Sequence, residues 1–199
     1  MVTWGELALL LGATFPEVTA VVSYVGSGVI HAGFVASPLE SENPPAWTYQ
    51  GKPLLPYLSF APNDVNQSRS SIRETPGFLR VLAEEELVEA ATIPVERIHG
   101  SVLLISGRDD QIWPSAMMSD ITMRRFAKHC HPFRYEHLCY AGAGHGIFQP
   151  YWPTTVHQYQ HPVDGLTYAI GGNAQDDAVA CADSWQNVLA FLAESLKAD

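Results

Sequence analysis

Positive charge and long apolar runs are both scarce in this sequence. Lysine and arginine number 11 against 21 aspartate and glutamate, so the 199-residue chain carries a formal net charge of −10. Such a charge disfavours nucleic acid or an anionic membrane surface as a partner, because phosphates repel it. No apolar run reaches the roughly 18 residues that cross a bilayer. Glu6 interrupts the first apolar stretch, which has no basic flank and is not typical of a secretory signal. We expect neither nucleic acid nor a membrane as a partner.

Cysteine is rare as well. The three cysteines, Cys130, Cys139 and Cys181, are odd in number and do not have the spacing of a metal site. His129 and His131 flank the first of them, but this pair falls at the end of a predicted helix, and we expect no metal there. Free thiols are typical of a reducing compartment. The sequence therefore predicts a cytoplasmic protein that needs neither a metal nor a cofactor.

Apolar residues make up 47% of the chain, enough for one α/β domain over residues 1–199. Hydrophobic patterning predicts helices at 5–14, 77–90, 114–128 and about 176–197, with a helical turn at 94–98. The helix at 5–14 is apolar nearly all round, which predicts burial on every side. Continuous or alternating apolar runs predict strands at 18–25, 102–105 and 133–140. Alternation of helices and strands favours a mostly parallel sheet with helices on both faces.

One long stretch, residues 37–76, is rich in proline, serine and asparagine and has little periodicity. We interpret it as a cap or lid excursion over the domain, with a hairpin near the sequence GKPLLPYL.

Polar residues with catalytic potential follow two neighbouring predicted strands. Asp109 and Asp110 come just after the strand at 102–105, and His145 lies in a glycine-rich loop after the strand at 133–140. Active sites of open α/β sheets lie at the carboxyl ends of the strands. An acid followed one strand later by a histidine matches the end of a Ser…Asp…His order. Either residue alone is more often a turn or surface residue, but together they favour a catalytic pair.

Four stretches carry a resemblance to a known family: GELALLLGATFPEVTAVVSYVGS, IPVERIHGSVLLISGRDDQIWPS, YAGAGHGIFQPYWPTT and GGNAQDDAVACADSWQNVLAFL. In this order they resemble the C-terminal catalytic domain of the acyl-CoA thioesterase and bile acid-CoA:amino acid N-acyltransferase family, an α/β-hydrolase group. The resemblance implies the C-terminal part of an α/β-hydrolase fold and an acyl-CoA or ester substrate. It makes Asp110 the triad acid and His145 the base. Asp109 becomes a neighbour that caps or hydrogen-bonds the loop.

The nucleophile of this family stands on an elbow that resembles Gly-x-Ser/Cys-x-Gly-Gly/Ala-Glu-Leu. If Glu6-Leu7 is the final pair, Val2 takes the nucleophile position, whereas a one-residue deletion puts Thr3 there. Valine cannot attack, and the extra methyl group of threonine crowds a strained turn. We also expect the first strands of the fold to be absent. The strand at 18–25 would then expose an edge that pairs with a second copy or with a separate N-terminal half.

Further residues have two interpretations each. Trp113 lines an acyl pocket or packs in the core, and Tyr151–Pro153 closes the site or is structural. Arg69, Arg73 and Arg80 bind coenzyme A phosphates or face solvent.

Three functions stay open at this point. The first is an acyl-CoA thioester hydrolase or N-acyltransferase domain with a nucleophile-Asp-His triad, and the second is a dienelactone-hydrolase-like carboxylesterase with the same order of acid and histidine. The third is a catalytically inactive remnant that serves as a binding or oligomerisation module.

Overall fold

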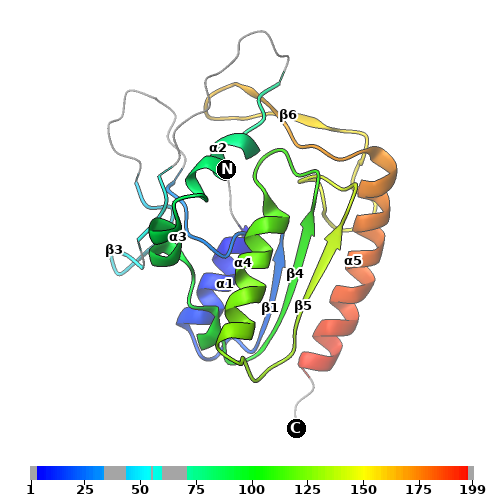
Figure 1. Cartoon of the computed structure of the whole chain (residues 1–199). Coiled ribbons are helices and arrows are strands. Elements are labelled where there is room, and N and C mark those ends of the chain that lie inside the picture. Colours follow the sequence, from blue (N-terminus) through cyan, green and yellow to red (C-terminus); the bar gives the residue numbers. More distant parts are fainter. Residues whose placement is uncertain (1–3, 34–43, 55, 60–70, 197–199) are drawn as a thin grey trace.

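A computed structural model describes residues 4–33, 44–54, 56–59 and 71–196. Its centre is a three-stranded parallel sheet in the order β1 (Ala20–Tyr24), β4 (Ser101–Gly107), β5 (Tyr135–Tyr140) (Figure 1). All three strands were predicted, as was their parallel arrangement. The α/β fold class is therefore confirmed.

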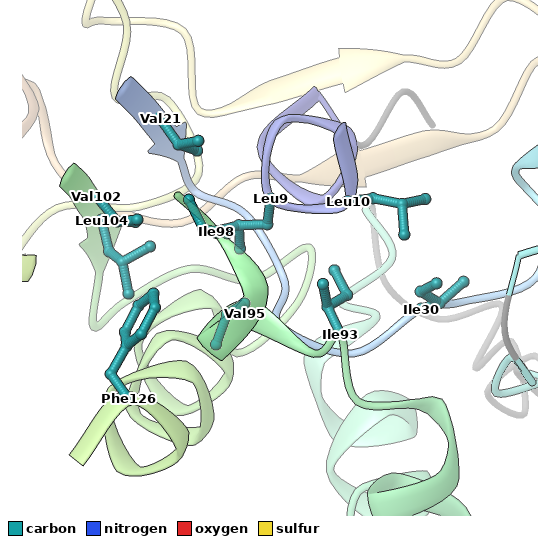
Figure 2. Packing of buried hydrophobic residues seen from close by; sticks show 10 residues of the cluster. All are labelled: Leu9, Leu10, Val21, Ile30, Ile93, Val95, Ile98, Val102, Leu104 and Phe126. Carbon is teal, nitrogen blue, oxygen red and sulfur yellow. The ribbon is translucent and has the colours of Figure 1, made fainter. Parts of the chain in front are cut away.

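Helices cover both faces of this sheet because the central strand β4 is apolar on both. Val102 and Leu104 point to one face, where they pack with α1 (Trp4–Thr14), the short helix η1 (Val95–Arg97) and α4 (Ser115–Lys128). Figure 2 shows this cluster, in which Phe126 of α4 approaches the strand residues. Leu103 and Ile105 point to the other face and pack against α5 (Ala174–Ser195). Successive side chains of a strand point to opposite faces of the sheet, which explains why neighbouring residues of β4 pack against different helices.

The loops after β4 and β5 touch at the carboxyl edge of the sheet. A side chain added at Gly107, the last residue of β4, would lie 2.3 Å from the carbonyl oxygen of Ala143. The loop after β5 therefore crosses directly over the end of β4. This contact brings the two loops that carry the predicted acid and histidine together.

The described part of the excursion holds a hairpin of β2 (Thr48–Tyr49) and β3 (Lys52–Pro53). Its turn residues Gln50 and Gly51 both have positive φ, 51° and 76°. A two-residue hairpin turn of type I′ requires positive φ at both positions. The expected hairpin is thus present, slightly earlier than GKPLLPYL. Residues 37–43, 55 and 60–70 of the predicted excursion lie outside the described residues.

The prediction of one helix over 77–90 is wrong. The chain forms α2 (Thr75–Val81) and α3 (Glu85–Ala91), separated at 82–84. The two helices bury side chains in different places: Phe78 packs with Trp113, whereas Ala91 packs with Val29 and Leu58. Leu82, between the two helices, contacts both clusters.

Two other features differ from expectation. The helix α1 is not buried on every side, since Trp4 is 71% and Leu11 40% exposed. An antiparallel hairpin of β6 (Gln158–Gln160) and β7 (Thr167–Ala169) was not predicted. An isolated β-bridge between Ile72 and Tyr168 joins this hairpin to the end of the excursion.

The strand β1 stands at one edge of the sheet. Among the described residues its only strand partner is β4. Pairing of this edge with a second copy or an N-terminal half stays a prediction.

Candidate active site

Asp110 is nearly inaccessible, with 3% of its surface exposed, yet both carboxylate oxygens have partners. Oδ1 accepts hydrogen bonds from the backbone N–H groups of Ile112 and Trp113, at 3.0 and 3.2 Å. Oδ2 lies 2.9 Å from Nδ1 of His145. One oxygen therefore fixes the loop after β4, and the other faces the imidazole.

The loop that carries His145 is held by hydrogen bonds from two successive backbone N–H groups. The His145 N–H donates to the carbonyl of Ile170 at 2.8 Å, and the Gly144 N–H donates to Oδ1 of Asp177 at 2.9 Å. Burial raises the pKa of Asp177, although the Gly144 N–H opposes this shift. With Nδ1 directed at Asp110, Nε2 is the ring nitrogen left for proton transfer. Asp177, which the sequence analysis did not single out, therefore holds the loop that carries His145.

Asp109 holds the adjoining loop. Its Oδ2 accepts a hydrogen bond of 2.9 Å from the N–H of Gly172. Gly172 has a φ of 73°, and a side chain there would lie 2.5 Å from the Asp177 carboxylate. The structure thus brings together Asp110 and His145, whereas Asp109 contacts Gly172 and, through Oδ1, the side chain of Gln111 in its own loop.

Trp113 forms a wall beside the histidine. Its indole ring lies edge to face with His145, with ring centres 5.7 Å apart, and only 2% of the residue is exposed. The indole N–H donates to the carbonyl of Val25, which follows β1, at 2.8 Å. Trp113 therefore both packs in the core and borders the candidate site.

A second carboxylate and histidine meet nearby, at the first turn of α1. Glu6 is fully buried; Oε2 lies 3.1 Å from His31 Nδ1, and Oε1 accepts a hydrogen bond from Trp47 Nε1 at 2.8 Å. The His31 ring is 6.0 Å from that of Trp113. Nothing in the sequence alone paired His31 with Glu6. A lone acid within the apolar run GELALLL was the available signal for a buried partner.

The first turn of α1 lies at the carboxyl edge of β1. A side chain at Gly5 would lie 2.6 Å from Cα of Gly26, just beyond that strand. The N–H groups at the start of a helix stabilise negative charge nearby. Val2 and Thr3, the two candidate nucleophile positions, lie outside the described residues.

Glu74, which sequence reasoning did not single out, belongs to the segment that rests on the Asp110 loop. Its N–H donates to the carbonyl of Gln111 at 2.9 Å, and the Thr75 hydroxyl donates to the carbonyl of Asp110 at 2.7 Å. Burial raises the pKa of Glu74 from 4.5 to about 7, and the Asp164 carboxylate adds to this effect. His145 acts in the opposite direction.

We expect Glu74 to make the free energy of unfolding fall as pH rises from about 4.5 to about 7. In this range the unfolded chain ionises Glu74 while the folded chain keeps it protonated, so the folded state binds more protons. The loss approaches about 3 kcal/mol for a shift of this size. Urea unfolding of the Glu74→Gln variant over this pH range should show a shallower fall. The exposed Glu84→Gln variant should keep the wild-type slope, and equal slopes for all three proteins would contradict the prediction.

The remaining candidates are placed as follows. Tyr151 and Trp152 are largely exposed, at 103% and 53%, so neither is buried over the site. Arg69 lies outside the described residues. His131 is buried against Phe126 and its Nε2 lies 3.2 Å from a backbone carbonyl, which gives it a structural role.

The described residues contain no group of three or more histidine, cysteine, aspartate or glutamate side chains arranged to hold a metal ion. In the same part of the chain, no helix combines the length and the apolar character that crossing a membrane requires.

The chain is similar in sequence to acyl-CoA thioesterases and to an N-acyltransferase. Mouse acyl-coenzyme A thioesterase 2, mitochondrial, is 28% identical over 192 residues, which are 96% of this chain and 38% of the relative. Mouse acyl-coenzyme A thioesterase 1 is 28% identical over 193 residues, 96% of this chain and 42% of the relative. Mouse acyl-coenzyme A amino acid N-acyltransferase 1 is 33% identical over 104 residues, 52% of this chain and 24% of the relative. The chain thus spans about two-fifths of the length of these two thioesterases.

The family model described as "BAAT / Acyl-CoA thioester hydrolase C terminal" matches residues 2–198. This match covers the sheet, its helices and both loops of the candidate site. It also agrees with the α/β-hydrolase type of fold expected from the sequence. The chain therefore belongs to the BAAT / acyl-CoA thioester hydrolase C-terminal family.

Proposed function

We propose that this chain cleaves acyl-CoA thioesters through Asp110 and His145 and passes the acyl group to water or to the amine of an amino acid. The observation that carries the proposal is the 2.9 Å contact between Asp110 Oδ2 and His145 Nδ1. This contact lies at the carboxyl edge of a parallel sheet, where α/β enzymes have their active sites. The thioesterase and N-acyltransferase relatives support the same substrate class.

The proposed chemistry assigns one proton to His145. Nε2 takes the proton of the attacking group as a bond forms to the thioester carbon. When the carbon–sulfur bond breaks, the same proton passes to the sulfur of coenzyme A, which leaves as a thiol. Asp110 stays ionised, keeps the imidazole in the required tautomer and stabilises its charged form. The first turn of α1 would face the negative charge on the carbonyl oxygen.

The attacking group sets the expected rate. Of the two candidate positions, Val2 has no nucleophilic atom, and Thr3 has a secondary hydroxyl beside a methyl group. A triad without its nucleophile keeps only part of its catalysis. We therefore expect slow turnover in which His145 activates water or the Thr3 hydroxyl.

Release of coenzyme A from a medium-chain acyl-CoA tests the proposal. The full chain should release it faster than the His145→Gln variant, because glutamine cannot accept the proton. His99→Gln is the matched control, since His99 is exposed and precedes β4 at the opposite end of the sheet. Chromatography of products formed with and without glycine separates hydrolysis from amide formation.

Two results would contradict the proposal. Cleavage of p-nitrophenyl esters without cleavage of acyl-CoA would favour the carboxylesterase alternative. Rates of acyl-CoA cleavage that are equal for wild type and His145→Gln would favour the inactive binding module.

A further inference from the structure

The inner face of α5 contacts the loop that carries His145 at two places. Asp177 stands in the first turn of α5 and Cys181 follows it by four residues, so the two side chains lie on the same face of the helix. Both residues are buried, with 2% and 3% of their surface exposed. This face therefore meets the loop with a carboxylate and a thiol, and not with apolar side chains alone.

The two side chains bond the loop on either side of the candidate base along the chain. Asp177 Oδ1 accepts a hydrogen bond from the N–H of Gly144 at 2.9 Å. Cys181 Sγ accepts one from the N–H of Phe148 at 3.3 Å, and its S–H donates weakly to the carbonyl oxygen of Gly146 at 3.6 Å. The backbone just before and just after the histidine is thus tied to α5.

The thiol has the protonation state that this arrangement requires. Burial raises the pKa of the Cys181 thiol, although the N–H of Phe148 opposes this shift. The thiol therefore keeps its proton at neutral pH, and the proton remains available for the carbonyl of Gly146.

The helix that supplies these bonds is itself anchored to the sheet. Val188 and Phe191 of α5 pack with Leu103 and Ile105 of β4 in one buried cluster. Figure 1 shows α5 alongside the sheet, with its first turns next to the loops at the carboxyl edge. Since the helix is fixed to the central strand, it can hold the loop at a constant distance from that strand.

The contact between Asp110 and His145 joins two loops, so its geometry depends on the support of both. The Asp110 carboxylate is held within its own loop by the N–H groups of Ile112 and Trp113. On the side of His145, the bonds to α5 are part of the support. A catalytic group that is displaced by about 1 Å can lose about a hundredfold in rate. Side chains that fix this loop can therefore affect a reaction in which they take no direct part.

We propose that Asp177 and Cys181 are positioning residues, which hold His145 within hydrogen-bonding distance of Asp110 and thereby set the rate of the proposed reaction. The proposal rests on the proposed function and extends it to two side chains that act through the backbone of the loop. Neither of them exchanges a proton with the substrate.

Nuclear magnetic resonance of the imidazole nitrogens of His145 tests the proposal without requiring turnover. In mildly alkaline solution, where the imidazole is neutral, wild type should show one tautomer with the proton on Nδ1, because Asp110 accepts it. Asp177→Ala and Cys181→Ala should each show both tautomers, because a released loop lets the ring leave the carboxylate. Loss of the signals in His145→Gln assigns them to this residue.

Turnover gives a second measurement. Asp177→Ala and Cys181→Ala should each lower kcat for acyl-CoA cleavage about tenfold and change KM less than about twofold, because an interaction that only orients the base leaves substrate binding intact. Asp177→Asn should restore most of the rate, since its amide oxygen can still accept from the N–H of Gly144. Cys181→Ser should do the same, since a hydroxyl both donates and accepts.

Two control variants make the same chemical changes away from these contacts. Asp176→Ala removes a carboxylate from the same turn of α5, where it bonds the side chain of Asn173. Cys139→Ala removes a thiol from β5. Both should keep the single tautomer of His145 and the wild-type kcat. Urea unfolding of every variant ensures that rates are compared between folded proteins.

Three results would overturn the proposal: a single tautomer with wild-type kcat in both alanine variants, equal losses in the two controls, or a rise in KM at unchanged kcat. A failure of the proposed function looks different, because wild type would then show no turnover that depends on His145. In that case the imidazole signals alone decide whether Asp177 and Cys181 position the ring.

Discussion

Replacing Thr3 with cysteine is expected to increase the rate of acyl-CoA cleavage about a thousandfold. This gain is smaller than the roughly million-fold loss of rate that follows removal of a triad nucleophile. Position 3 directly precedes α1, whose first turn lies at the carboxyl edge of β1. If position 3 is the elbow position, as the family resemblance implies, a thiol there stands just before a helix N-terminus, which favours the thiolate. His145 already has Nδ1 directed at Asp110, so Nε2 can serve the new nucleophile.

The design isolates the role of His145. The gain should disappear in the double variant Thr3→Cys/His145→Gln, because a thiol without its base is not activated in this way. Thr14→Cys is the matched control, since Thr14 ends the same helix at its far side. Chromatographic separation of acyl-CoA from coenzyme A measures the rate without interference from the natural cysteines. A gain that survives loss of His145, or equal rates for Thr3→Cys and wild type, would contradict the assignment of position 3 to the elbow.

The sequence predicts the sheet well because its three strands carry strong local signals. Val102 to Ile105 form an apolar run with buried side chains on both faces, which is typical of a central parallel strand. The loops after β4 and β5 are then forced to meet, since parallel strands end at the same edge. For this reason Asp110 and His145 could be placed near each other without coordinates, whereas their catalytic roles stay a proposal.

Features that depend on distant contacts were not predictable in the same way. The break between α2 and α3 occurs within a stretch of good helix formers, where the local sequence carries no stop signal, and Phe78 and Ala91 pack in different clusters. Likewise, Asp177 resembles any acid in the first turn of a helix. Its contact with the Gly144 N–H, 33 positions earlier, has no signal in the local sequence.

The contact of Glu6 with His31 and Trp47 is another such feature, and it has the largest expected effect on stability. Leucine at position 6 would leave two nitrogen atoms, His31 Nδ1 and Trp47 Nε1, without the oxygens they now face. The other ring nitrogen of His31, Nε2, already has no hydrogen-bond partner among the described residues. We expect Glu6→Leu to lower the free energy of unfolding by about 3 kcal/mol, the scale of a buried polar pair that loses one member.

Two further variants distinguish this cause from a simple change of volume in α1. Glu6→Gln keeps an oxygen for Trp47 and an amide that can face His31, so it should cost only about 1 kcal/mol. Glu6→Leu/His31→Leu removes both members of the pair and should be more stable than Glu6→Leu alone, because no imidazole is left buried without a partner. Urea unfolding with comparison of m-values measures each difference.

Glu17→Leu serves as the control, since Glu17 is exposed just after α1 and should change stability by less than about 0.5 kcal/mol. If Glu6→Leu is as stable as Glu17→Leu, the contacts of Glu6 contribute nothing net and α1 is held by its apolar side chains alone. If the double variant is less stable than Glu6→Leu, the His31 ring stabilises the fold through its packing against Phe78 and Trp113 rather than through Glu6. If the stabilities of the variants follow the expected order, the Glu6 carboxylate, and not the hydrophobic side chains around it, holds the first turn of α1 next to the candidate site.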